Sequence, residues 1–209
     1  LVCTMNVTVA TEQTRKMFGW SHEEMEKQIL STPAGASGLL FLPYLNGERT
    51  PNLPGGTGMF HGLTTGNMTP THMARAVMEG VTLGLAYGLN RFRELGIRPT
   101  EIRLTGGGSN SGVWRQMCAD IFGVPTVCLA SAEGAALGAA IQAAYACHAA
   151  QGKPVTYREL CGRIVQLDAQ SRCVPDEALQ PVYATLLARQ GDITRRMHAG
   201  GLLESGTKQ

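Results

Sequence analysis

The segment 101–120, EIRLTGGGSNSGVWRQMCAD, constrains the fold more than any other part of the chain. It joins a short apolar strand to three consecutive glycines and then to polar residues that open a helix. Gly106, Gly107 and Gly108 have no Cβ, so the backbone can take a positive φ and approach a flat ligand closely. The helix expected from about Ser111 offers free N–H groups and the positive end of its dipole. This arrangement predicts a nucleotide-binding turn, although many α/β turns need glycine only for a sharp reversal.

Strands and helices alternate between residues 58 and 149, which predicts a layered α/β domain. We expect strands at 38–42, 58–63, 102–105 and 125–129. We expect helices at 8–18, from Ser21, at 70–95, 111–122, 132–149 and 176–198. Residues 151–175 show no regular pattern, and residues 200–209 are expected to fray.

The helix expected at 70–95 carries Gly80, Gly84 and Gly88 at intervals of four residues. Each interior glycine costs roughly 0.5–1 kcal/mol relative to alanine. We therefore expect a neighbouring backbone to approach this bare face of the helix. On the same helix Arg75 and Glu79 form an i,i+4 pair, expected to contribute a few tenths of a kcal/mol.

The composition excludes several classes of protein. The chain has 209 residues, 44% of them hydrophobic, 16% charged, and a net charge of +2, which fits a globular protein and offers no basis for binding nucleic acid or an anionic membrane. No apolar run approaches the ~18 residues of a membrane span. The six cysteines include no C-x-x-C pair, which predicts reduced thiols in a cytosolic setting. The five histidines lack ligand spacing, so we expect no metal site.

Six stretches in the same order and spacing resemble one family. They are FLPYLNGERTP at 41–51, GMFHGL at 58–63, ARAVMEG at 74–80, GGG at 106–108, WRQMCAD at 114–120 and GAALGAA at 134–140. Together they resemble the carboxy-terminal domain of the carbohydrate kinases that phosphorylate pentuloses, glycerol and gluconate. The implied fold is α/β, a ribonuclease H-like or actin-hexokinase-type ATPase domain with a mixed sheet flanked by helices.

The resemblance also implies how the chain is organised. Residues 1–199 would form the nucleotide-binding domain without its first strands, and residues 200–209 a frayed tail. The sugar-binding domain, the catalytic Asp base and both phosphate loops would lie before Leu1. We therefore expect ATP and Mg²⁺ to act in the full-length enzyme, no catalytic residue in this chain, and an inactive fragment.

Within the domain, the triglycine turn resembles the adenosine motif of the family. Gly106 and Gly107 match its paired glycines. The position where many relatives carry Asn is Ser111 here, with Asn110 just before it, and the resemblance leaves open which of the two side chains bonds the nucleotide. The expected nucleotide-binding residues are Gly106, Gly107, Gly108, Asn110 and Ser111.

The run at 43–51 resembles xylulokinases more than glycerol kinases. This implies that the full-length protein converts D-xylulose to D-xylulose 5-phosphate in the cytoplasm; homodimers are common among such enzymes. Two alternatives stay open: a kinase for another sugar or polyol, and a non-catalytic nucleotide-binding or dimerisation module of the same fold. A Rossmann-type dinucleotide site is disfavoured because the glycine spacing is not G-x-G-x-x-G.

Overall fold

The computed structural model describes residues 1–131 and 133–204. The helices are α1 (Val7–Met17), α2 (His22–Leu30), α3 (Pro70–Glu94), α4 (Gly112–Phe122), α5 (Gly134–Ala150), α6 (Tyr157–Ile164) and α7 (Gln180–Ala199). The strands are β1 (Leu40–Pro43), β2 (Gly58–His61), β3 (Ile102–Leu104), β4 (Thr126–Leu129) and β5 (Leu167–Cys173). Three short 3-10 helices, η1 (Ala36–Gly38), η2 (Gly107–Asn110) and η3 (Glu177–Leu179), connect them.

The strands form two small sheets. β1 and β2 pair antiparallel, with Phe41 opposite Phe60. In the second sheet β3 runs parallel to β4, and β4 runs antiparallel to β5. The predicted α/β fold with a mixed sheet flanked by helices is confirmed.

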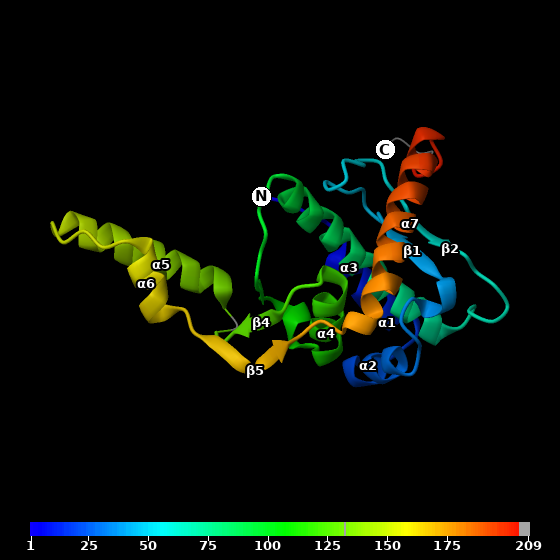
Figure 1. Ribbon diagram of the computed structural model, residues 1–209, viewed down its shortest axis with the longest axis horizontal. Helices are drawn as coiled ribbons and strands as arrows, with labels where there is room; N and C mark the ends of the chain where they lie inside the picture. Colours follow the sequence, from blue (N-terminus) through cyan, green and yellow to red (C-terminus); the bar gives the residue numbers. More distant parts are fainter. Residues whose placement is uncertain (132, 205–209) are drawn as a thin grey trace.

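Helix α3 lies at the centre of the molecule (Figure 1) and contacts β1, α1, α2, α4 and α7. The hydroxyl of Thr69 caps it by accepting a 3.3 Å hydrogen bond from the backbone N–H of His72. Proline occupies its first turn, where a missing N–H costs nothing. This start agrees with the sequence prediction.

The glycine face of α3 is explained at two of its three positions. A Cβ at Gly80 would collide with the carbonyl oxygen of Phe41 in β1, and one at Gly88 would meet the side chain of Val2. The predicted close approach of a backbone is thus confirmed at Gly80. At Gly84 the nearest atom would be Cγ of Pro43, at 3.9 Å, so no described residue requires a glycine there.

The pair of Arg75 and Glu79, expected to contribute only a few tenths of a kcal/mol, lies inside the fold, because the side chain of Glu79 is 2% exposed and that of Arg75 is 11% exposed. Glu79 Oε1 accepts hydrogen bonds from Arg75 Nε (2.8 Å), the backbone N–H of Gly35 (2.9 Å) and the hydroxyl of Tyr183 (3.2 Å). Arg75 also donates to the carbonyl of Thr32 at 2.7 Å. Burial raises the pKa of Glu79, and the Arg75 charge opposes that rise. The pair joins α2, α3 and α7.

The region 151–175, for which the sequence predicted nothing regular, contains α6 and β5. Helix α6 begins with a capping box in which the side chains of Thr156 and Glu159 bond each other's backbone N–H groups. It packs on α5, where the rings of Tyr145 and Tyr157 stack 4.3 Å apart. The two helices extend away from the rest of the molecule (Figure 1).

The expected fraying of residues 200–209 is wrong for residues 200–204. Leu203 is 1% exposed, and its carbonyl accepts hydrogen bonds from the N–H and hydroxyl of Thr57 at 2.8 and 2.9 Å. Residues 205–209 lie outside the described residues. Within residues 1–131 and 133–204, no helix has both the length and the apolar character needed to span a membrane.

Candidate functional site

The triglycine turn follows β3 and leads into α4. Gly106 takes a φ of +88°, the left-handed region that favours glycine. The next four residues form η2, which is closed by a 3.0 Å hydrogen bond from the N–H of Ser109 to the carbonyl of Gly106. The side chain of Arg115 holds the far end, because its Nη1 donates to the carbonyl of Ser109 at 2.8 Å. The turn is therefore fixed from both ends.

The three glycines differ in what the structure demands of them. Gly106 is needed for its positive φ. A Cβ at Gly108 would lie 2.9 Å from the ring of Trp114, so this position must stay bare for packing. A Cβ at Gly107 would have no atom of the protein within 4 Å. The absence of a side chain at Gly107 therefore has no cause within the described part of the chain, and it leaves the backbone open to a ligand.

A cavity of about 560 Å³ lies between this turn and helices α1, α2 and α3. Its walls combine small hydroxyl groups, carboxylates and apolar side chains. The lining residues are Thr8, Thr11, Glu12, His22, Met25, Glu26, Met78, Gly107, Gly108, Asn110, Ser111 and Trp114. Four of the five residues that the sequence predicted for nucleotide binding thus border one cavity.

The fifth residue, Gly106, borders a second cavity of about 500 Å³ at the ends of β3 and β4. Gly107 and Asn110 border both cavities. The glycine turn consequently separates the two cavities.

Asn110 and Ser111 are not equivalent at this site. The hydroxyl oxygen of Ser111 accepts a 3.1 Å hydrogen bond from the N–H of Trp114 and so caps α4. That leaves the hydroxyl hydrogen of Ser111 free to be donated. Asn110 is exposed, so its amide can present both a donor and an acceptor to a ligand.

The charges around the larger cavity suit the uncharged end of a nucleotide. Glu12 and Glu26 line it, whereas its lining includes no lysine or arginine among the described residues. A hydrogen bond from Arg15 lowers the pKa of Glu12, which is therefore ionised at neutral pH. A carboxylate accepts hydrogen bonds from hydroxyl and amino groups and repels phosphate.

The sequence reasoning missed the contribution of α1 and of Trp114 to the cavity walls. Thr11 and Gly107 are almost a hundred residues apart, and no local pattern signals that they line the same cavity. Trp114 stands three residues after the cap Ser111, and that spacing signals a position in the first turn of α4 facing the turn. No group of three or more His, Cys, Asp or Glu side chains in the described ranges could hold a metal ion.

Comparisons with known proteins identify the family of this chain. The model of the C-terminal domain of the FGGY family of carbohydrate kinases matches residues 6–147. The xylulose kinase of Haemophilus influenzae is 40% identical over 176 residues, which is 84% of this chain and 35% of that protein. The xylulose kinase of Escherichia coli is 52% identical over 84 residues, or 40% of this chain and 17% of that protein. The chain thus spans about a third or less of these relatives.

Solved structures of carbohydrate kinases also resemble this chain. The xylulose kinase of Lactobacillus acidophilus superposes with a TM-score of 0.84 at 29% identity, covering 94% of this chain and 39% of that one. The gluconate kinase of the same organism gives 0.82 at 28% identity, with coverage of 93% and 39%. These neighbours have the actin-hexokinase-type ATPase fold that the sequence predicted. The chain belongs to the FGGY family of carbohydrate kinases and contains the C-terminal domain of that family.

Proposed function

We propose that this chain is the nucleotide-binding half of an ATP-dependent sugar kinase, and that the full-length protein phosphorylates D-xylulose to D-xylulose 5-phosphate. The observation that carries the proposal is the open backbone at Gly107 beside a cavity of about 560 Å³. The similarity to xylulose kinases supports the choice of sugar.

In this proposal the adenosine part of ATP occupies the cavity. The backbone at Gly107 and Gly108 lies against the nucleoside, and the amide of Asn110 and the hydroxyl of Ser111 bond its polar edges. The carboxylate of Glu12 accepts from an amino or hydroxyl group on the opposite wall. The triphosphate points away from this acidic lining, toward cationic groups supplied by the rest of the full-length enzyme.

The reaction transfers the γ-phosphoryl group. A bond forms between the sugar 5-hydroxyl oxygen and the γ-phosphorus, and the bond from that phosphorus to the bridging oxygen of ADP breaks. The hydroxyl proton passes to an Asp base that, like the phosphate loops, we place outside this chain. Mg²⁺ would neutralise phosphate charge in the full-length enzyme, and we place the enzyme in the cytoplasm.

A second candidate is a kinase for another sugar or polyol of the same family. The superposition on a gluconate kinase is nearly as close as that on a xylulose kinase. The fold of the C-terminal domain therefore does not distinguish a xylulose kinase from a gluconate kinase.

The test is an ADP-release assay on the full-length protein with D-xylulose, D-gluconate and glycerol. We expect kcat/KM for D-xylulose to exceed the others by at least about tenfold. Preference for another sugar would select the second candidate. ADP binding without any sugar-dependent release would select the non-catalytic module instead. The isolated chain should release no ADP in response to sugar, and sugar-dependent turnover by it would refute the proposed division of labour.

A further inference from the structure

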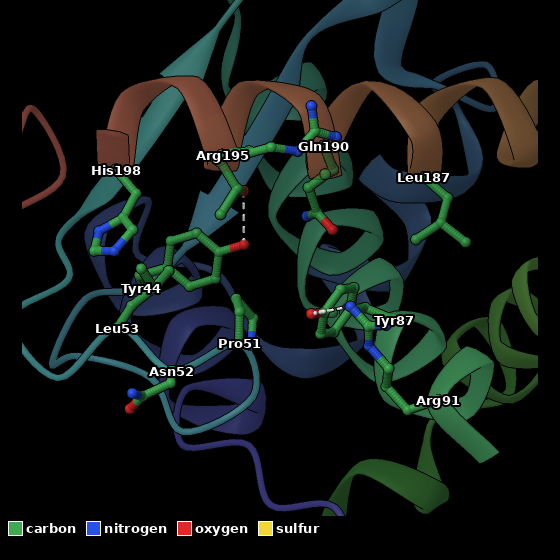
Figure 2. A pocket seen from close by; sticks show the side chains of 13 residues that line it. Tyr44, Pro51, Asn52, Leu53, Tyr87, Arg91, Leu187, Gln190, Arg195 and His198 are labelled. Carbon is green, nitrogen blue, oxygen red and sulfur yellow. Dashed lines mark hydrogen bonds between the residues drawn. The ribbon is translucent and has the colours of Figure 1, made fainter. Parts of the chain in front are cut away.

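A third cavity lies between α3, α7 and the loop that follows β1, and Figure 2 shows the side chains that line it. Its volume is about 300 Å³, and it shares no lining residue with the two cavities at the glycine turn. It is therefore separate from the proposed nucleotide site, and neither the family resemblance nor the proposed function gives it a role.

Two glycines on facing helices keep this space open. Gly84 of α3 and Gly191 of α7 both line the cavity. A Cβ at Gly84 would meet only Cγ of Pro43 at 3.9 Å, and one at Gly191 would meet no atom within 4 Å. Glycine inside a helix is unfavourable relative to alanine. At Gly80 the structure explains the glycine, because a Cβ there would collide with the carbonyl oxygen of Phe41. No such reason exists at Gly84 or Gly191 in the described part of the chain, and the absence of side chains at both positions widens the cavity between the two helices.

A buried amide faces this cavity. Gln190 lines it and is only 3% exposed. Its Nε2 donates to the carbonyl oxygens of Phe41 (3.2 Å) and Gly80 (2.9 Å), which fixes the orientation of the amide. Among the described residues, no donor is bonded to its Oε1. Oε1 is therefore free to accept a hydrogen bond from a hydroxyl or N–H of a ligand in the cavity.

The remaining walls are apolar and aromatic. Tyr44, Leu53, Tyr87 and Leu187 contribute rings and aliphatic groups that fit a flat apolar ring. The hydroxyl of Tyr44 is held by Thr194 at 2.9 Å, so this wall is rigid.

The charged groups that line the cavity are all basic. Arg91 and Arg195 line it together with His198, and its lining includes no Asp or Glu among the described residues. Their acidic partners, Glu94 at 2.7 Å from Arg91 and Asp192 at 3.0 Å from Arg195, stand outside the lining. Arg91 is further positioned by its 2.7 Å bond to the hydroxyl of Tyr87. The lining therefore offers cationic donors to an anion, which would share them with these two carboxylates.

We propose that this cavity binds a small monocyclic aromatic acid that carries a hydroxyl group opposite its carboxylate. The ring packs between Tyr44 and Tyr87. The hydroxyl donates to Oε1 of Gln190 at the buried end, and the carboxylate meets Arg91 at the exposed end.

The probe is 4-hydroxybenzoate, titrated calorimetrically into the full-length protein with and without saturating ATP. We expect saturable binding with a Kd below ~1 mM, which is ordinary for a ligand of this size. ATP should leave this Kd unchanged, because the two cavities share no lining residue. Absence of saturable binding, or competition by ATP, would overturn the proposal, and neither result would bear on kinase activity.

Variants locate the site. Gly84→Leu fills the cavity and should weaken binding at least about tenfold, whereas the matched control Gly84→Ala adds one methyl group and should stay within about twofold. Arg91→Gln, at an exposed side chain that folding does not require, should weaken binding of 4-hydroxybenzoate about tenfold and leave the neutral analogue 4-hydroxybenzyl alcohol unaffected. Unchanged affinity in both Gly84→Leu and Arg91→Gln would place the ligand elsewhere and end the proposal.

Discussion

The indole nitrogen of Trp114 donates a 2.9 Å hydrogen bond to Oγ1 of Thr82, and both side chains are buried. The hydroxyl of Thr82 in turn donates a 2.7 Å hydrogen bond to the backbone carbonyl of Met78. This chain of bonds ties α4 to α3 and sets the indole ring against Gly108. The wall of the proposed nucleotide cavity thus depends on a contact between two helices.

Replacing Thr82 by valine tests this tie. The variant keeps the shape of the side chain but leaves the buried N–H of Trp114 without an acceptor, which should lower the free energy of unfolding by about 1–3 kcal/mol. The control Thr185→Val, at an exposed position of α7, should stay within about 0.5 kcal/mol. Urea unfolding of the full-length protein measures both, and equal stabilities would show that the bond contributes little.

The glycines of α3 should respond in opposite directions to alanine. Gly80→Ala forces a methyl group onto the Phe41 carbonyl and should destabilise the protein by about 1–3 kcal/mol. Gly84→Ala meets no atom closer than 3.9 Å and should stabilise it by roughly 0.5–1 kcal/mol. Thermal melting of the two variants side by side is sufficient, and effects of the same sign would contradict the structure.

The buried pair of Arg75 and Glu79 should contribute far more than a surface pair. Glu79→Gln leaves the Arg75 guanidinium buried without a counter-charge, and we expect a loss of about 3–5 kcal/mol in the free energy of unfolding. The exposed pair of Arg91 and Glu94 provides the control, since Glu94→Gln should cost less than about 1 kcal/mol. A loss below about 1 kcal/mol for Glu79→Gln would mean that the pair behaves as if it were solvated.

Stability should fall in alkaline solution, and Tyr44 should account for part of the slope. Burial raises the pKa of Tyr44 from 10.0 to about 12 in the folded protein. Between these pH values the unfolded chain loses a proton that the folded protein keeps, so the free energy of unfolding decreases as the pH rises, by up to ~1.4 kcal/mol per pH unit for this group. Burial also raises the pKa of the Cys118 thiol from 9.0 to about 12, with the same sign.

Tyr44→Phe isolates the contribution of Tyr44. The variant lowers stability at all pH values because it loses the bond to Thr194, but its slope above pH 10 should be shallower than that of the wild type. Urea unfolding at a series of pH values gives the free energy of unfolding of both proteins. If the two curves against pH are parallel, Tyr44 has the same pKa in the folded and the unfolded protein, which contradicts this account.

Local signals in the sequence predicted most of the elements. The helix starts predicted at Ser21, residue 70 and Ser111 are confirmed, and Ser21, Thr69 and Ser111 cap these helices, because an N-cap needs only a residue type and its neighbours. The miss at 151–175 has a physical cause: β5 is almost wholly exposed, so it has no apolar alternation to detect. The capping box at Thr156 and Glu159 was a readable signal of α6.

The sequence could not predict which residues are buried by contacts between segments that lie far apart in the chain. Arg75 and Glu79 have the spacing of an ordinary surface pair, and contacts from distant segments, Thr32 and Gly35 after α2 and Tyr183 of α7, make them an internal network. The glycine turn was foreseen because three adjacent glycines are a local feature. The opposite wall was not foreseen, because only the tertiary fold places α1 and the turn around the same cavity.

The most direct test of the account is the affinity of the full-length protein for ADP after Gly107→Ala, measured by calorimetry. A methyl group at this position touches no atom of the protein, and Gly107 does not have a positive φ, so the melting temperature should be unchanged. The control Gly138→Ala, also in open space but in α5, should bind ADP as the wild type does. We predict that Gly107→Ala weakens ADP binding at least about tenfold, because the methyl group occupies the space of the nucleoside. Wild-type ADP affinity in the Gly107→Ala variant would contradict the proposal that the nucleotide lies against this turn.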